Sequence, residues 1–448
     1  MEAGASEPPL RLGYARCSAS RHVAAGAEHR AYSLTLRCCA DVVASSTDVS
    51  EALDSVVIGA GEAGLSASYH LRRLGLDHVV LDADEAPGGA WRHRWDSLTM
   101  DDVHGVADLP DAPAPARGHM LANVVIPAWF GQYERARDLP VVRPVRVDWV
   151  ESAGDLLLVH AGSQSWTTRT IVNATGTWTR PFVPFYPGQE TFRGEQFHTI
   201  DFPGPEHFRG KRTLVVGGGA SAVQFLGEIR PVTDTIWVTR NEPVWRDRIE
   251  EFDGRAAIAL VEKRVRRGLP PSSVVSVTGI GLRPQEQEAK RLGAYERRPM
   301  FARIESDGVR WADGSFEPVG AILWATGFRP ALGHLAPLRL KSQHGGIRLL
   351  TSTSDVQSAT TAAVDPRVQL VGYGPSASTI GGNRAGRAAA TAVDRWVRAA
   401  KSPSIGSSPP PGPHSRDLDD SSSSAPSRCC GLAGVVDSPD LRVMRRSS

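Results

Sequence analysis

Short apolar runs alternate with segments of helical spacing along the middle of the chain. The clearest case starts with the apolar run Val56–Ile58 and continues, after a glycine-rich stretch, into Leu65–Leu74, where apolar residues recur at helical spacing. A second apolar run follows at His78–Leu81. This order predicts a strand, a tight turn, a helix and a second strand, which is the unit from which parallel α/β sheets are built.

The predicted turn carries Gly59, Gly61 and Gly64 in the spacing G-x-G-x-x-G, and Asp82 ends the second strand 23 residues after Gly59. In the dinucleotide-binding fingerprint, the first glycine makes the turn and the second lets the backbone approach a pyrophosphate at the helix N-terminus. The third lets helix and strand pack closely, and the acid accepts a hydrogen bond from a ribose hydroxyl. The sequence therefore predicts a dinucleotide site. A glycine turn without a ligand would leave the carboxylate of Asp82 unexplained.

The same pattern returns in the second half of the chain. The predicted strand Thr213–Val216 leads through a second glycine turn into a helix over Val223–Ile229, and the strand Thr235–Val238 follows. This turn has the form G-x-G-x-x-A, and its candidate cofactor-binding residues are Gly217, Gly219, Ser221 and Ala222. The two turns lie 158 residues apart, and two copies of one supersecondary plan are hard to obtain by chance.

Each half also carries the tripeptide Ala-Thr-Gly after a predicted strand. One copy follows Thr170–Asn173 and the other follows Ile322–Trp324, with an offset of 151 residues. The candidate residues in these tripeptides are Ala174, Thr175, Gly176, Ala325, Thr326 and Gly327. The repetition predicts two Rossmann-type dinucleotide-binding domains.

The two copies differ most in the residue that ends the second strand. Arg240 stands 23 residues after Gly217, where Asp82 stands in the first copy. A carboxylate suits a free ribose 2′-hydroxyl, whereas an arginine suits a 2′-phosphate. The first site is therefore expected to hold FAD or NAD and the second NADPH. The alternative for Arg240 is a solvated surface charge.

Further segments complete the expected site. Paired glycines beside a tryptophan in Pro87–Trp91 predict a loop passing close to a flat ligand, or else an ordinary turn with a packing Trp. From this loop Gly89 and Trp91 are candidates, with Val147 from a predicted strand Val145–Trp149 and Gly372 after a predicted strand Val368–Val371. A last helix from about Asn383 to Ala400 returns to complete the first domain.

The remaining middle segments are interpreted more simply. Residues 98–127 hold several prolines and are expected to be a variable loop. Strands are predicted at Leu139–Val142 and Leu156–His160, and Asp307-Gly308 and Asp313-Gly314 predict hairpin turns. A basic helical run, Arg255–Arg267, is expected to present a solvated face.

Composition limits the class of protein. The chain has 448 residues, 41% of them hydrophobic and 22% charged, with a net charge of +2, so neither nucleic acid nor a membrane is an expected partner. The expected organisation is a disordered extension over 1–52, an FAD domain over 54–205 and 326–400, an NADPH domain over 206–325, and a disordered tail over 401–448. Lysine and arginine total 51 with only five lysines, which suggests a bacterial cytoplasmic protein.

Chemistry carried by side chains is not evident. No cysteine lies between residues 40 and 428, so neither a disulfide framework nor a redox-active dithiol is expected. The sequence shows no Ser-His-Asp order and no metal-ligand spacing. The catalytic residues are therefore left open, with the reactive group expected to belong to the cofactor.

Residues 54–400 resemble the single-component, NADPH-dependent flavoprotein monooxygenases, the group of flavin-containing monooxygenases and Baeyer-Villiger enzymes. The resemblance rests on GAGEAG at Gly59, PGGAW at Pro87, NATG at Asn173, F-x-G-x-x-x-H at Phe192, GGGASA at Gly217 and WATGF at Trp324. Some similar bacterial proteins are linked to arsenic resistance. The Phe192 motif ends in Phe202-Pro203, a hybrid of the two subgroups, so the type of atom oxygenated stays open.

The resemblance implies that NADPH reduces FAD, that O2 adds at the flavin C4a atom, and that retained NADP shelters the adduct while it oxygenates a small molecule. His198 matches the family motif, with a hinge role between domains favoured over acid-base work. Two other functions stay open. One is a reductase that passes electrons to a small or protein acceptor, and the other is a flavin-binding regulatory protein without turnover.

Overall fold

The computed structural model describes residues 52–103, 105–246, 254–271, 280–350, 359–377 and 379–401. The extension expected over 1–52 and the tail expected over 401–448 lie outside these ranges, apart from Ala52 and Lys401. All five cysteines also lie outside them.

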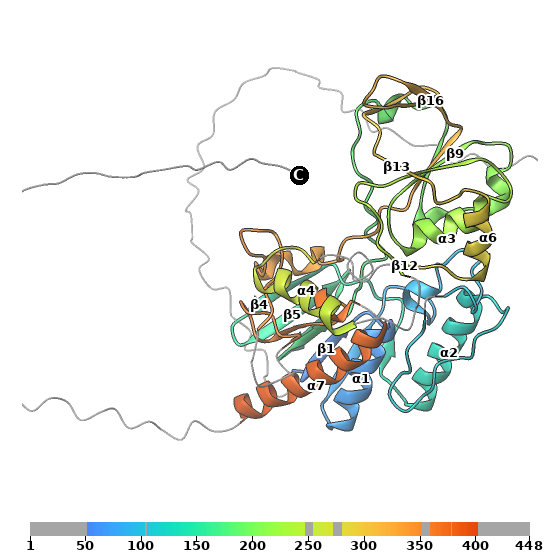
Figure 1. The fold of residues 1–448 in the computed structure, drawn as a ribbon. Helices are drawn as coiled ribbons and strands as arrows, with labels where there is room; N and C mark the ends of the chain where they lie inside the picture. Colours follow the sequence, from blue (N-terminus) through green and yellow to red (C-terminus); the bar gives the residue numbers. More distant parts are fainter. Residues whose placement is uncertain are drawn as a thin grey trace, which may run out of the picture. The chain divides into compact units, whose positions relative to one another are not determined.

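The first half of the fold is a five-stranded parallel sheet. Its strands lie in the order β18 (Val368–Leu370), β7 (Ile171–Asn173), β1 (Ser55–Ile58), β2 (His78–Leu81) and β3 (Val141–Val142). The residues of β18, β7 and β1 are all buried, as expected for apolar strands of a parallel sheet covered on its faces. Helices α1 (Glu62–Arg73) and α7 (Thr379–Lys401) lie side by side in this half (Figure 1).

The second half repeats this arrangement. Its parallel strands lie in the order β13 (Arg297–Arg298), β10 (Thr235–Val238), β9 (Thr213–Val216), β17 (Ala321–Trp324) and β8 (Glu195–His198). Helix α3 (Ala220–Ile229) follows β9 and packs beside α6 (Pro284–Arg291) (Figure 1). The predicted α/β class with two Rossmann-type sheets is confirmed. Because β8 pairs with β17, the second sheet begins before residue 206.

A small antiparallel sheet is inserted into each half. One consists of β4 (Trp149–Ala153), β5 (Leu156–Ala161) and β6 (Gln164–Thr168), and the other of β14 (Arg303–Glu305), β15 (Gly308–Arg310) and β16 (Phe316–Pro318). Both predicted hairpin turns join strands of the latter. Each insert precedes the strand that ends in Ala-Thr-Gly, so the internal repeat extends beyond the glycine turns.

Three predicted segments show the main differences from the structure. Helix α2 (Ala122–Ala136) occupies part of the expected variable loop, because Ile126, Phe130 and Tyr133 bury one face despite Pro127 inside the helix. Strand β4 starts at Trp149, where the predicted strand Val145–Trp149 ends. Helix α7 begins at Thr379, before Asn383.

The remaining elements are short, apart from α4. They are η2 (Gly89–Trp91), η3 (Gln189–Thr191), η4 (Thr199–Asp201), η5 (Pro205–Phe208), η7 (Gly333–Leu338), η9 (Gly374–Ser376), β11 (Trp245–Arg246), β12 (Ile280–Gly281) and α4 (Gly254–Arg266). Helix α4 buries Val261 and Val265, while Lys263 and Arg264 are exposed, which confirms its predicted solvated face.

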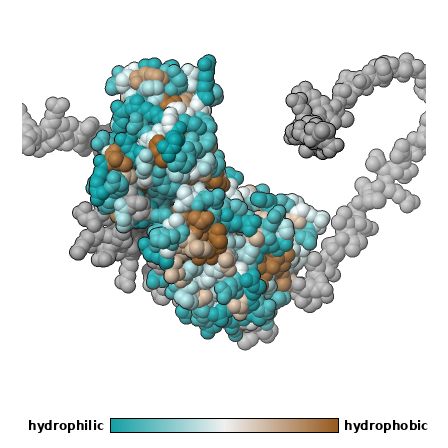
Figure 2. All heavy atoms as spheres, turned by 90° about the vertical axis from the view of Figure 1, so that its right-hand side faces the viewer, coloured by the Kyte–Doolittle hydropathy of each residue, from teal (hydrophilic) through white to brown (hydrophobic). Residues whose placement is uncertain are grey.

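The surface is predominantly polar on the face that Figure 2 shows, with a few small and separate hydrophobic patches. Within the described residues, no helix has the length and apolar character needed to cross a membrane.

Candidate dinucleotide-binding site

The first glycine turn is shaped by the protein's own backbone at two of its three glycines. Gly59 has φ +101°, and a Cβ there would lie 2.7 Å from the carbonyl oxygen of Ala174. A Cβ on Gly64 would overlap the carbonyl oxygen of Gly59. In contrast, nothing lies within 4 Å of the place that a Cβ on Gly61 would take. The open space in front of Gly61, at the start of α1, fits the pyrophosphate of a dinucleotide.

The second turn has the same asymmetry. Gly217 has φ +145°, and a Cβ there would overlap the carbonyl oxygen of Ala325, whereas nothing lies within 4 Å of a Cβ on Gly219. Ala222, at the third position, is buried against the sheet. Each turn thus touches the Ala-Thr-Gly segment of its own half and leaves its middle glycine facing empty space.

Both turns line one cavity of about 920 Å³. Most of the predicted site residues line it, namely Gly59, Gly61, Asp82, Gly89, Trp91, Val147, Ala174, Thr175, Gly176, Gly219, Ser221, Ala325, Gly327 and Gly372. Three further predicted residues pack against the protein within the turns and do not line the cavity: Gly64, Gly217 and Ala222. The cavity therefore brings together residues from both halves of the repeat.

Asp82 is held by an arginine as well as facing the cavity. Arg143 Nε donates to its Oδ2 at 2.9 Å, and the other two guanidinium nitrogens donate to the carboxylate of Glu134 at 2.7 Å each. Burial raises the pKa of Asp82, and the charge of Arg143 opposes that effect. The acid is thereby oriented at the end of β2, where the fingerprint requires an acceptor for a ribose hydroxyl.

Two side chains lining the cavity have buried polar atoms without hydrogen-bond partners among the described residues: Glu62 Oε1 and Arg94 Nε. Buried polar groups in proteins are nearly always paired. Burial raises the pKa of Glu62 to about 8 and lowers that of Arg94 to about 10. Orphaned polar atoms beside two open glycine turns fit a site completed by a bound polar ligand such as a dinucleotide.

The two Ala-Thr-Gly segments begin two linkers that pair with each other. Phe182 N donates to Gly327 O at 3.0 Å, Arg329 N to Arg180 O at 2.8 Å, and Ala331 N to Gly176 O at 3.0 Å. The threonines exchange bonds as well: Thr175 Oγ1 donates to Ala331 O at 2.7 Å, and Thr326 Oγ1 donates to Phe182 O. The repeated tripeptide therefore marks the two crossings between the halves.

His334 is a cavity residue that the sequence did not reveal. Its Nε2 lies 2.6 Å from Asn173 Oδ1, so this nitrogen carries the proton, and Asn173 Nδ2 donates to Thr175 Oγ1 at 3.2 Å. Burial lowers the pKa of His334 to about 4, which keeps the ring neutral at pH 7. Glu62, Arg94 and Trp178 were missed too, although all three lie within or just after a motif; His334 has no such local signal.

His198, for which a hinge role was favoured over acid-base work, and Asp102, which follows the Trp91 loop, both make hydrogen bonds within the protein. His198 Nε2 lies 3.0 Å from the carbonyl oxygen of Gly327, and burial lowers the pKa of the ring. Asp102 Oδ2 accepts from Thr99 Oγ1 at 2.6 Å, and the Asp102 carbonyl accepts from Gln224 Nε2 at 2.9 Å. Neither residue lines the cavity. His198 instead joins the β8 motif to a crossing between the halves.

Arg240 is exposed at the end of β10 and does not line the cavity. Arg297 of the neighbouring strand β13 pairs with Trp237, and it donates through Nε to Thr239 Oγ1 at 2.7 Å and through NH1 to Glu242 at 2.8 Å. Arg240 makes no hydrogen bond or ion pair with the described residues, although its charge opposes the rise that burial causes in the pKa of Tyr186.

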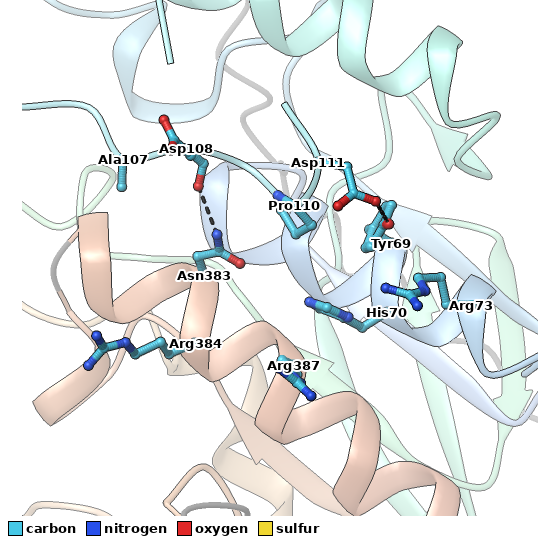
Figure 3. A pocket seen from close by; sticks show the side chains of 10 residues that line it. All are labelled: Tyr69, His70, Arg73, Ala107, Asp108, Pro110, Asp111, Asn383, Arg384 and Arg387. Atoms are coloured by element: carbon cyan, nitrogen blue, oxygen red, sulfur yellow. Dashed lines mark hydrogen bonds between the residues drawn. The ribbon is translucent and has the colours of Figure 1, made fainter. Parts of the chain in front are cut away.

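A second, smaller hollow of about 430 Å³ lies between α1, α7 and the segment before α2 (Figure 3). Tyr69 donates to Asp111, and Asn383 Nδ2 donates to the carbonyl of Asp108 at 2.8 Å. None of the predicted site residues lines this hollow. In the described ranges no group of three or more His, Cys, Asp or Glu side chains could hold a metal ion.

Comparison with known proteins supports the nucleotide-binding assignment. Residues 56–255 match the family described as pyridine nucleotide-disulphide oxidoreductase. A solved flavin-containing monooxygenase from Stenotrophomonas maltophilia is 36% identical, with a TM-score of 0.66, over 78% of this chain and 99% of that one. A Baeyer-Villiger monooxygenase of Streptomyces coelicolor is 28% identical over 60% of this chain and 54% of that protein.

The fold extends to proteins of other activities. A bacillithiol disulfide reductase from Bacillus cereus is 16% identical and superposes with a TM-score of 0.57, which shows a shared fold. The family descriptions name a pyridine nucleotide and a flavin, and they support the predicted pair of cofactors, FAD and NADPH. With 36% identity over nearly the whole of a solved relative, the chain belongs to the flavin-containing monooxygenases and is a flavin-dependent oxidoreductase.

Proposed function

We propose that the protein inserts one oxygen atom from O2 into a small molecule, with FAD at the first glycine turn and NADPH at the second. One cavity lined by both turns carries the proposal, because a nicotinamide must reach a flavin for hydride to pass between them. The reaction balances as NADPH, a proton, O2 and substrate giving NADP+, water and the oxygenated product. The arginine-rich, cysteine-poor composition supports a bacterial, cytoplasmic enzyme.

FAD bound at this site would supply the redox chemistry, namely acceptance of hydride from NADPH and activation of O2. The residues of the chain bind and orient the cofactors and exclude water from the cavity. Gly61 and Gly219 leave room for the two pyrophosphates, and Asp82 would accept a hydrogen bond from the FAD ribose. The aromatic side chains of Trp91 and Trp178 line the cavity and limit the access of water.

Arg240 is proposed to select NADPH over NADH. Its side chain is exposed at the end of β10, in the position where the fingerprint places the group that meets the ribose 2′ substituent. A guanidinium forms strong charge-assisted bonds with a phosphate there.

A second candidate is a reductase that passes electrons from NADPH through FAD to an acceptor. The family matched over residues 56–255 includes disulphide oxidoreductases in its description, which favours this alternative. The absence of cysteine between residues 40 and 428 argues against it, since no dithiol in that interval can relay electrons. A non-catalytic flavin-binding regulator is the third candidate.

The deciding experiment follows 18O2 into product. Purified protein with FAD and NADPH is offered an amine, a sulfide, a ketone and an arsenical, and products are examined by mass spectrometry. A monooxygenase gives one labelled oxygen per turnover. In stopped flow, the reduced protein mixed with O2 should show a transient absorbance band distinct from oxidised flavin, and NADP+ should prolong it. Direct reoxidation with release of peroxide would favour the reductase, and no oxidation of NADPH would favour the regulator.

A further inference from the structure

Arg94 lies three residues after Trp91, in the loop that lines the cavity. Its guanidinium carbon is 4.4 Å from the ring centroid of Trp178 and 5.3 Å from that of Trp91. Such contacts with indole rings hold a cation in place without neutralising it. The Nε atom is buried and has no hydrogen-bond partner among the described residues.

Other arginines with little exposed side chain differ from Arg94 because they have ion-pair partners. Each of them bonds a carboxylate: Arg143 bonds Asp82, Arg283 bonds Glu286, and Arg367 bonds Asp365. No ion pair is found for Arg94 within the described ranges, and burial is the only influence on its pKa, which falls to about 10. At neutral pH Arg94 therefore stays charged, with no counter-charge from the described residues.

The acidic side chains that line the same cavity do not supply a counter-charge for Arg94. The carboxyl of Glu62 has its pKa raised to about 8 by burial, so it is mostly neutral at pH 7. Asp82 is bonded to Arg143, Asp84 Oδ1 lies 3.0 Å from His93 Nε2, and Asp148 Oδ2 accepts from Gly162 N at 2.7 Å. Arg94 is partly exposed to the cavity, but its Nε atom is buried, and a buried polar group without a partner is destabilising. The missing partner of Arg94 is therefore expected to arrive with the ligand.

The location of Arg94 indicates that its partner is the reactive ring of the ligand and not the phosphates. Trp178, which it contacts, stands on the linker that follows Thr175 and stacks on Phe328 of the opposite linker, with ring centroids 4.9 Å apart. This is the junction between the two halves, where a flavin bound to one half would meet a nicotinamide bound to the other. The pyrophosphate places, by contrast, lie at Gly61 and Gly219.

We propose that Arg94 is the counter-charge of the reduced flavin. Transfer of hydride from NADPH adds two electrons and one proton to neutral FAD, which leaves the ring with one negative charge unless a further proton is taken up. Arg94 holds that charge and so raises the reduction potential of the bound flavin. The inference rests on the proposed binding of FAD but not on oxygenation of any substrate.

The test compares Arg94→Met with Arg94→Lys, and uses Arg92→Met as a matched control, since Arg92 is exposed in the same loop and does not line the cavity. The midpoint potential of bound FAD is measured by dithionite titration, without NADPH or O2. Arg94→Met should weaken binding of reduced FAD relative to oxidised FAD about tenfold or more, which is about 30 mV or more for a two-electron couple. Arg94→Lys should recover most of the loss, and Arg92→Met should match the unmodified protein.

A second readout needs no variant. The unmodified protein with reduced FAD should show the spectrum of the anionic flavin from pH 6 to 8, and appearance of the neutral reduced form in that range would overturn the proposal. An unchanged potential in Arg94→Met would overturn it as well. If that variant instead loses affinity for oxidised FAD or NADP+ by the full factor, Arg94 binds a phosphate. Because no turnover is involved, these outcomes are independent of whether the protein proves to be a monooxygenase.

Discussion

Each glycine turn contains small residues that are required for different reasons. Gly59 and Gly64 are small because their own backbone neighbours leave no room for a Cβ, whereas Gly61 faces open space. Gly217 and Gly219 divide in the same way. A structural glycine and a ligand-facing glycine can therefore be separated by substitution, although they occupy one motif.

Gly61→Val should fold normally and lose FAD, because its side chain would fill the space left for the pyrophosphate. Bound flavin is measured by absorbance after gel filtration, and folding by circular dichroism. Gly64→Val is the matched control: its side chain would overlap Gly59 O, so we expect loss of the folded state along with the flavin. Full flavin content in folded Gly61→Val would show that this turn does not bind FAD.

Arg240→Ala should weaken NADPH binding and leave NADH nearly unaffected, because only NADPH carries the 2′-phosphate. The loss of charged hydrogen bonds corresponds to about 1.5–3 kcal/mol, or roughly 10- to 150-fold in affinity. Steady-state kinetics with each cofactor provide the measurement. Arg297→Ala, which removes the bonds to Thr239 and Glu242, should impair both cofactors alike. Equal losses with both cofactors in Arg240→Ala would reveal a structural role.

At the scale of elements, local pattern determines what could be predicted. The strands Thr213–Val216 and Thr235–Val238 match β9 and β10 residue for residue, because buried apolar runs bounded by turn residues carry their own signal. Helix α2 was missed because Pro127 and the prolines that precede the helix suggest a loop, while its buried face depends on partners elsewhere. The hydrogen bond from Thr175 to Ala331 spans 156 residues, and no local sequence pattern predicts it.

The contact of α1 with α7 offers a test at the same scale. A Cβ on Gly386 would lie 2.7 Å from the backbone nitrogen of Ala67, so the two helices approach as closely as a glycine permits. Gly386→Val should destabilise the fold by about 1–3 kcal/mol through overpacking. Ala399→Val, at an exposed position of the same helix, should cost less. Urea unfolding curves would measure both, and equal stabilities would contradict this account.

The charge state of the whole molecule in acid depends on buried histidines. Burial is the largest cause that lowers the pKa of His334 and of His70 to about 4, and that of His78 below its usual value. An unfolded histidine titrates near pH 6.5. Between about pH 6.5 and 4, these histidines therefore bind protons in the unfolded chain but not in the folded protein. The contribution of these histidines to the free energy of unfolding should consequently fall as pH decreases through this window, while Glu62, whose pKa burial raises to about 8, acts in the opposite direction.

His334→Gln should reduce that pH dependence. A single such group contributes at most about 1.4 kcal/mol per pH unit within the window, and none above it. The free energy of unfolding is measured by urea titration at several values between pH 4 and pH 7.5, with His93→Gln at a more exposed histidine as the control. An identical slope in His334→Gln and the unmodified protein would mean that His334 titrates normally.

The paired linkers have a consequence for how such a molecule can be taken apart and rebuilt. The chain leaves the first half near Gly176 and re-enters it near Ala331, and these two points are joined by a hydrogen bond. A segment whose ends lie together can be inserted into, or excised from, a host without stretching either one. The second half is accordingly an insertion in the first half. A short turn in place of residues 177–330 would reconnect the chain of the first half.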